Sequence, residues 1–160
     1  MAKKLNSMRF LDAQGVRYEV LSFPDTIQSA MGVAAYCGLS PSHVYKTLVV
    51  VLSSGKPALV LVAGDRDIQL KRLAQVLGEK KLRMATQKEA EQWTGLKVGG
   101  ISALALHHRG FPVYIDRAAA AVEAIVVSAG QRGLDVRLTV ADLMRATEAT
   151  FVEATTPPAS

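Results

Sequence analysis

One lysine in a hydrophobic stretch is the first residue of this chain whose chemistry needs an explanation. Lys46 stands near the start of the stretch 44–52, which reads VYKTLVVVL. The β-branched and apolar residues of this stretch predict a buried strand. Burying an ammonium group without a partner is costly, so the side chain either leads its charge out to solvent or faces a cavity where an anion or a polarised carbonyl meets it. An isolated case would favour solvent, but the other stretches of the chain favour the cavity.

A glycine-rich stretch is the second candidate for chemistry. Residues 95–102 read GLKVGGIS, with three glycines in six residues. Glycine lets a backbone approach a ligand closely and leaves its N–H groups uncovered. Glycines alone also fit an ordinary loop, so both interpretations stay open at this point.

Residue types that bind metals or act as nucleophiles are scarce. His107 and His108 are adjacent, but the third histidine is the distant His43, and Cys37 is the single cysteine. Two adjacent histidines without further histidine or cysteine ligands nearby do not make a zinc site, so we expect no metal and no cofactor. Cys37 falls on an expected helix without a neighbouring cation, which favours a buried inert thiol over a nucleophile.

Composition limits the class of protein. The chain has 160 residues, of which 49% are hydrophobic and 21% charged, as in one ordinary globular domain. No apolar run reaches the length of a signal peptide or membrane span, so we expect a cytoplasmic protein that does not contact a membrane. The net charge is +5, and the segment 66–88 alone carries seven basic against two acidic residues. That surplus fits contact with a polyanion, and a solvated helix face is the other interpretation.

Periodicity predicts the elements that position these residues. We expect helices at 3–14, 29–37 and 68–77, a helix opened by a Thr86 and Glu89 capping box, and a last helix from Thr139 through 146. We expect strands at 17–23, 44–52, 57–63, 81–85, 112–116, 124–128, 134–138 and 151–152. Strands outnumber helices and several are joined by hairpins, which predicts an α+β fold with a mixed, mostly antiparallel, curled or barrel-like sheet surrounded by helices. We expect one domain over 1–153 and a flexible tail over 154–160.

Five stretches taken together resemble one known family. They are VYKTLVV at 44–50, LKRLAQVLGEKKLRMA at 70–85, TGLKVGGIS at 94–102, PVYID at 112–116 and SAGQRGLDVRL at 128–138. In this order and spacing they resemble the YbaK family of small aminoacyl-tRNA deacylases, which is similar to the editing domain inserted in bacterial prolyl-tRNA synthetases. The resemblance covers residues 5–153. It implies a mixed sheet curled around a pocket, and hydrolysis of mischarged tRNA in trans.

The resemblance also implies roles for particular residues. Lys46 matches the pocket lysine of the family, whose charge can hold the carbonyl or the phosphate of the terminal adenosine. Backbone groups around Gly99, Gly100 and Ile101, and around Ala129 and Gly130, would align the carbonyl and the attacking water. An aminoacyl ester is already activated, so positioning and oxyanion stabilisation suffice without a metal or a covalent nucleophile.

Four further positions follow from the same resemblance. Asp135 matches an acidic pocket residue that contacts the substrate's α-amino group or steadies the lysine, although a turn residue at the start of a strand is the other interpretation. Asp116 we interpret as structural. Ser29 and Ala30 stand in the segment that lines the amino-acid pocket, where close relatives have an aromatic residue and a glycine. The family's loop usually runs G-x-x-x-P, and Ala103 takes the place of the proline, which frees one N–H and softens the loop.

The substrate implied is the acceptor end of a mischarged tRNA, with Cys-tRNA(Pro) first. In the YbaK branch the thiol of the substrate helps to expel its own tRNA by cyclising, which needs no protein nucleophile. Alanine or another small amino acid on tRNA(Pro) is the alternative within the same enzyme class. A non-catalytic module that binds tRNA or aminoacyl-adenosine and partners prolyl-tRNA synthetase is the other alternative. Contacts to phosphate do not read sequence, so the choice of tRNA could come from that partner.

Overall fold

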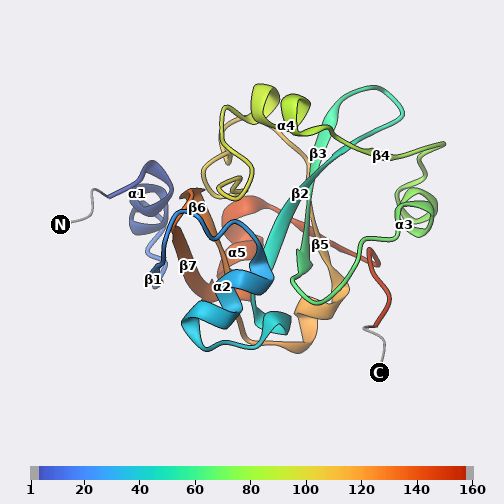
Figure 1. Ribbon diagram of the computed structural model, residues 1–160. Coiled ribbons are helices and arrows are strands. Elements are labelled where there is room, and N and C mark those ends of the chain that lie inside the picture. Colours follow the sequence, from blue (N-terminus) through green and yellow to red (C-terminus); the bar gives the residue numbers. More distant parts are fainter. Residues whose placement is uncertain (1–3, 158–160) are drawn as a thin grey trace.

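A two-stranded hairpin forms the centre of the molecule. In the computed structural model, which describes residues 4–157, β2 (Tyr45–Val51) and β3 (Pro57–Ala63) pair antiparallel along their whole length. The turn between them closes when the Gly55 amide donates to the Leu52 carbonyl, and Gly55 has a φ of 86°. This confirms the predicted hairpin, and Figure 1 shows it running through the middle of the molecule.

The hairpin belongs to a mixed five-stranded sheet in the order β4-β2-β3-β5-β8. The short β4 (Arg83–Met84) pairs antiparallel with the end of β2, while β5 (Val113–Asp116) and β8 (Thr150–Val152) add parallel to β3 and to each other. Parallel neighbours need long crossover connections, and here these carry helices.

A second, antiparallel sheet has the order β1-β7-β6, with β1 at Glu19–Ser22, β7 at Leu134–Thr139 and β6 at Ala124–Gln131. The two sheets meet where Val44, just before β2, forms a parallel bridge with Val126. The α+β class and the mixed sheet are thus confirmed. The expectation of a barrel-like sheet is wrong. The strands between residues 19 and 152 form two separate sheets, which this bridge joins at one corner.

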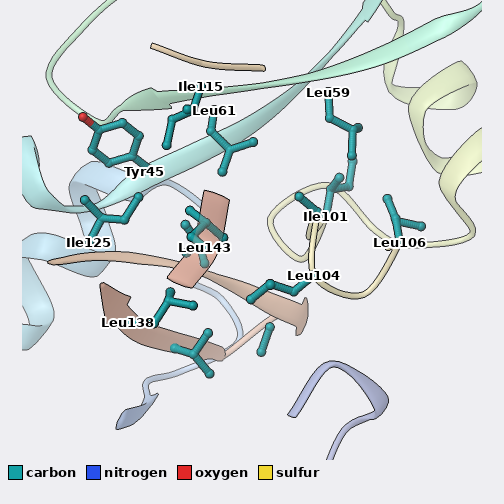
Figure 2. Packing of buried hydrophobic residues seen from close by; sticks show 14 of the residues in the cluster. Tyr45, Leu59, Leu61, Ile101, Leu104, Leu106, Ile115, Ile125, Leu138 and Leu143 are labelled. Atoms are coloured by element: carbon teal, nitrogen blue, oxygen red, sulfur yellow. The ribbon is translucent and has the colours of Figure 1, made fainter. Parts of the chain in front are cut away.

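The main hydrophobic core lies between the two sheets. Figure 2 shows Leu59 and Leu61 of β3, Ile125 of β6 and Leu143 of the last helix directed into it. Each of these side chains is at most 1% exposed, and burying one such side chain stabilises the fold by about 2 kcal/mol. Ile101, near the end of the glycine stretch, enters the same core together with Leu104 and Leu106, which follow the stretch, so the loop is anchored at its base.

Between residues 4 and 157, five helices cover the sheets. Each is two turns long, so tertiary packing rather than intrinsic propensity stabilises them. Residue 3 of the first expected helix lies outside the described residues. The capping box predicted at Thr86 and Glu89 is present, and both of its hydrogen bonds form. The five are α1 (Asn6–Ala13), α2 (Ala30–Cys37), α3 (Leu70–Leu77), α4 (Gln87–Thr94) and α5 (Val140–Thr147). Short 3₁₀ turns occupy Pro41–His43 and Arg117–Ala121.

The C-terminal segment is held by Asp116, at the end of β5. Its carboxylate accepts hydrogen bonds from the amides of Ala154 and Thr155 and from the Thr155 hydroxyl. Asp116 is therefore structural, as expected. The expectation of a flexible tail from 154 is wrong for these two residues, which are buried, and positions 158–160 lie outside the described residues. No helix within 4–157 is long and apolar enough to cross a membrane.

Candidate active site

A cavity of about 400 Å³ opens along one edge of β2. We call it the β2 cavity. On this edge β2 is bridged to the small sheet at Val44 and paired with β4 at Val50, and the residues between these two points have a strand neighbour on one side only. Five successive residues, 45–49, line the cavity. Side chains alternate along a strand, so a run of five means that the strand's edge faces the hollow.

Lys46 lies on this open edge, partly buried, opposite Val62 of β3. It forms no ion pair with any residue of the described range. The cavity interpretation of this lysine is the one that the structure supports. Its neighbour Tyr45 is not a candidate base, since burial raises the pKa of the Tyr45 phenol to about 12.

The glycine stretch forms another wall of the β2 cavity, through Val98, Gly99 and Ile101. Its backbone is fixed at Val98, whose N–H donates to Glu91 Oε2 at 2.9 Å and whose carbonyl accepts from Arg132 Nε at 2.7 Å. Because the N–H and the carbonyl of Val98 are both hydrogen-bonded, the neighbouring amides of the loop are held in a constant position.

The amides of this loop are not equivalent. Gly100 N–H donates to the Lys97 carbonyl at 2.8 Å and is therefore already used. The amides of Gly99 and Ile101 donate to no atom within residues 4–157. Of the three amides at Gly99, Gly100 and Ile101, the first and the last are therefore available to a ligand.

Glycine is required at both central positions. Gly99 has a φ of +94°, and a Cβ there would lie 3.0 Å from the Cβ of Gln28. A Cβ on Gly100 would lie 2.9 Å from the backbone nitrogen of Arg132. The loop thus passes between the segment before α2 and the β6–β7 turn with no room for a side chain.

Asp135 contributes a carboxyl group to the β2 cavity from β7. It faces Ser128 of β6 across the ladder, and both residues line the cavity. Asp135 is 5% exposed, and this burial raises the pKa of its carboxyl group to about 7. The group therefore changes charge near neutral pH, which fits a site that exchanges a proton or meets an ammonium ion.

A β-bulge in β6 determines where Ala129 and Gly130 point. The ladder with β7 shifts register between Ser128 and Gln131. The Ala129 carbonyl accepts from the Ser7 hydroxyl of α1, and the Gly130 amide donates to Ser128 Oγ at 3.2 Å. Both backbone groups are thus occupied by side chains of the protein.

Six of the nine expected site residues line the β2 cavity, and three do not. Ala129 is 1% exposed in the main core. Gly100 and Gly130 line a neighbouring hollow on the other side of the loop. The bulge and the close approach of the loop to the β6–β7 turn account for this displacement. The six are Ser29, Ala30, Lys46, Gly99, Ile101 and Asp135.

The segment before and within α2 forms a further wall of the β2 cavity. Ser29 is the N-cap of α2, and its hydroxyl accepts from Gly32 N–H at 3.0 Å, so its oxygen is committed to the helix. Sequence reasoning missed Gln28 and Met31, which also line the cavity, although both stand in the stretch DTIQSAMG that carries Ser29 and Ala30. Met31 is 52% exposed, so this part of the wall also meets solvent.

Ala103, which stands in place of the family's proline, is 4% exposed in the core. The turn that follows it is closed by hydrogen bonds from Ala105 N–H to Ser102 Oγ and from Leu106 N–H to the Ser102 carbonyl. The loop is held by the packing of Ile101 in the core and by these two hydrogen bonds. They offset the loss of the rigid proline ring at position 103.

The cysteine and histidines take no part in the β2 cavity. Burial, and then the nearby Asp135, raise the pKa of the Cys37 thiol, which keeps it protonated. His107 stacks on Phe10 with ring centroids 3.6 Å apart, and His108 meets His107 edge-on. Within residues 4–157 no group of three or more His, Cys, Asp or Glu side chains could hold a metal ion.

Comparisons with known proteins identify the family of this chain. The family model of the aminoacyl-tRNA editing domain matches residues 25–146. A presumed Cys-tRNA(Pro)/Cys-tRNA(Cys) deacylase of Enterococcus faecalis, EbsC, is 33% identical over 156 residues, which cover 96% of this chain and 94% of that protein. A proline–tRNA ligase of Nitratidesulfovibrio vulgaris strain DP4 is 39% identical over 75 residues, 47% of this chain but 13% of the ligase.

A solved structure shows the same fold. The crystal structure of a presumed trans-editing enzyme for prolyl tRNA synthetase superposes with a TM-score of 0.81 at 24% identity, covering 97% of this chain and all of the other. The fold is that of an aminoacyl-tRNA editing domain. The chain belongs to the aminoacyl-tRNA editing domain family, and the deacylase class expected from its sequence is confirmed at the level of the family.

Proposed function

We propose that this protein is a free-standing deacylase that hydrolyses the ester bond of mischarged tRNA in trans, with Cys-tRNA(Pro) as its substrate. The observation that carries the proposal is the joint placement of a cation and two unused amides. Lys46, Gly99 and Ile101 line the same cavity, and the amides of the two loop residues donate to no atom within residues 4–157.

These groups can perform ester cleavage without a nucleophile from the protein. Lys46 would attract the ester carbonyl or the phosphate of the terminal adenosine into the cavity. The two amides would then donate hydrogen bonds to the carbonyl oxygen. These bonds stabilise the negative charge that develops on this oxygen when the carbonyl carbon is attacked. One well-placed oxyanion donor contributes about 100-fold or more to such a rate.

The attacking group depends on the amino acid. With cysteine, its own Sγ can attack the ester carbon: a sulfur–carbon bond forms, the carbon–oxygen bond to the ribose breaks, and the ribose oxygen takes up the proton that the thiol gives up. Water then opens the cyclic thioester that is released, which completes the hydrolysis. With alanine or another small amino acid, a water molecule must attack instead. The walls near Met31, Val33 and Val49 are apolar and suit a small uncharged side chain or a thiol.

Asp135 supports the recognition of an amino acid rather than of any ester. An aminoacyl group carries an α-ammonium next to its carbonyl, and a carboxylate on the cavity wall can pair with it. Such a pair would stabilise the charged form of Asp135 against the burial that raises its pKa.

The function is tested by the loss of labelled amino acid from Cys-, Ala- and Pro-tRNA(Pro), with wild type and Lys46→Ala compared in parallel. Clearance of Cys-tRNA(Pro) by the wild type alone, with Pro-tRNA(Pro) spared, would support the proposal. Clearance of Ala-tRNA(Pro) alone would contradict Cys-tRNA(Pro) as the substrate and assign Ala-tRNA(Pro) in its place. Saturable tRNA binding without clearance of any species would contradict it and favour a binding module.

Prolyl-tRNA synthetase is the partner we propose, and the cytoplasm, where aminoacyl-tRNA is used, is the place of action. Support comes from the relationship to segments of proline–tRNA ligases. Sequence-blind phosphate contacts would leave the choice of tRNA to that partner. Co-elution of the two proteins in the presence of tRNA(Pro) is the corresponding measurement, and separate elution would contradict the partnership.

A further inference from the structure

A second hollow, of about 570 Å³, adjoins the β2 cavity on the far side of the glycine loop. We call it the side hollow. Three segments that are distant in the sequence form it. The loop before α2 contributes Asp25 and Gln28, the residues after α4 contribute Lys97, and the β6–β7 turn contributes Gln131 and Arg132. The proposed catalytic chemistry uses none of these side chains.

The two hollows share a wall that is one backbone thick. Gln28 lines both of them. Of the two consecutive glycines, Gly99 lines the β2 cavity and Gly100 lines the side hollow. The Gly99–Gly100 peptide is therefore the partition, and the absence of side chains keeps it thin. For a flexible chain whose end lies in the β2 cavity, the side hollow is thus the adjoining hollow, across this one peptide.

The side hollow presents donors suited to a phosphate. Lys97 is exposed, and its ammonium has no partner within residues 4–157. Arg132 is oriented by its Nε, which donates to the Val98 carbonyl at 2.7 Å, and its two terminal nitrogens have no acceptor among the described residues. A guanidinium with both outer nitrogens available is the side chain that most often binds phosphate oxygens. Asp25 is the one carboxylate in this lining, so the cations outnumber it by two to one.

The neutral side chains of the side hollow suit a base. Gln28 and Gln131 each offer an amide with a donor and an acceptor, the combination that the edge of a single-stranded pyrimidine presents in return. No aromatic residue lines the hollow, so recognition would rest on the base edge rather than on stacking.

We propose that the side hollow binds the nucleotide that precedes the aminoacylated adenosine, with its phosphate on Lys97 and Arg132 and its base edge on Gln28 and Gln131. This inference rests on the proposed function, because it takes the aminoacyl ester as the occupant of the β2 cavity. All tRNAs end in the same CCA sequence, so this contact adds affinity for an acceptor end without selecting one tRNA.

The experiment compares two non-hydrolysable ligands by calorimetry. One is adenosine with cysteine joined to the 3′ position through an amide, and the other is the trinucleotide CCA with the same linkage. We expect the trinucleotide to bind the wild type about tenfold more tightly, the value of roughly one charge-assisted hydrogen bond. Lys97→Ala should remove most of this advantage and leave the affinity for the adenosine ligand unchanged.

Three further variants sharpen the test. Lys56→Ala removes an exposed lysine from the β2–β3 turn, far from the hollow, and should keep the tenfold ratio. Gln131→Ala should lower the ratio. Asp25→Asn, which removes the opposing carboxylate, should raise it. Circular dichroism of each variant verifies that the fold is retained.

Equal affinities of the two ligands for the wild type would overturn the inference, as would the absence of binding by either. The same ratio in Lys97→Ala and Lys56→Ala would also overturn it. The outcome is separate from that of the proposed function. Clearance of Cys-tRNA(Pro) together with equal affinities for the two ligands would support the deacylase function and contradict the nucleotide site in the side hollow. A tenfold affinity ratio without clearance would support the nucleotide site and contradict the deacylase function.

Discussion

Lys46 and Asp135 line the same cavity, yet they form no ion pair with each other. A close ammonium would favour the ionised carboxylate and lower its pKa, whereas the pKa of Asp135 is raised to about 7 by burial. The two opposite charges are therefore held apart, and each remains available to a ligand that carries the complementary charge.

The raised pKa of Asp135 predicts a pH dependence of stability. The folded protein holds this proton up to about pH 7, while the unfolded chain releases it near pH 3.8. Between these values the folded state binds more protons, so the free energy of unfolding falls as pH rises, and it levels off above 7. Asp135→Asn should lack this slope and gain on the order of 2–3 kcal/mol relative to wild type between pH 5 and pH 8. Urea unfolding at the two values measures the difference, and parallel curves would contradict the prediction.

The same group predicts a pH dependence of activity. If the carboxylate pairs with the α-ammonium of the substrate, kcat/KM for deacylation should rise as Asp135 ionises around pH 7. Asp135→Asn should lower the plateau and lose this rise. A profile of the variant that keeps the wild-type shape would assign the rise to the substrate's own amino group.

Lys46→Ala should reduce deacylation about 100-fold or more while the protein stays folded, because its charge is needed at the carbonyl and its side chain is only partly buried. Lys46→Arg keeps the charge but not the shape and should recover part of the loss. Single-turnover rates with Cys-tRNA(Pro) test both variants. Lys56→Ala is the matched control, and an equal loss in this variant would show that net charge, not the site, is responsible.

Gly99→Ala and Gly55→Ala separate backbone strain from lost function. Both glycines have positive φ, +94° and +86°, so alanine strains each by about 1–2 kcal/mol. At Gly55 a Cβ meets nothing within 4 Å, whereas at Gly99 it meets the Cβ of Gln28 at 3.0 Å. We expect both variants to lose stability, but only Gly99→Ala to lower kcat, because it moves the oxyanion amides. Equal kcat values would remove the loop from the proposed chemistry.

Asp116→Ala should be a stability variant and not an activity variant. It removes the acceptor of three buried hydrogen bonds from Ala154 and Thr155 and should cost about 3 kcal/mol of unfolding free energy. Asp67→Ala, at an exposed position, is the control and should change the stability by less than about 0.5 kcal/mol. A loss of kcat at a temperature where Asp116→Ala is folded would contradict its structural role.

Local patterns were sufficient for most elements and for part of the site. Apolar runs and turn residues located the hairpin, and the Thr86 and Glu89 pair located the start of α4. The parallel neighbours of β3 were not predictable, because strand pairing over 50 or more residues leaves no local trace. The division into two sheets was missed for the same reason.

Within the site, Lys46, Gly99 and Asp135, which the resemblance names, line one cavity, and their roles stay predictions. The resemblance could not place Ala129, because the direction of this residue depends on a bulge between Ser128 and Gln131. Nor could it show that the Gly100 amide is already paired within its own loop. Such features depend on the hydrogen bonds of individual backbone groups, which residue types do not reveal.

Because β2 has an open edge, the groups that bind the common part of every amino acid are separate from the groups that select its side chain. A strand edge offers N–H and C=O groups that every substitution except proline leaves in place, and these match the part that all amino acids have in common. The facing wall at Ala30 and Met31 consists of side chains on one short helix. A few substitutions in α2 could therefore redirect the protein to a different amino acid while the strand, the loop and the reaction stay as they are.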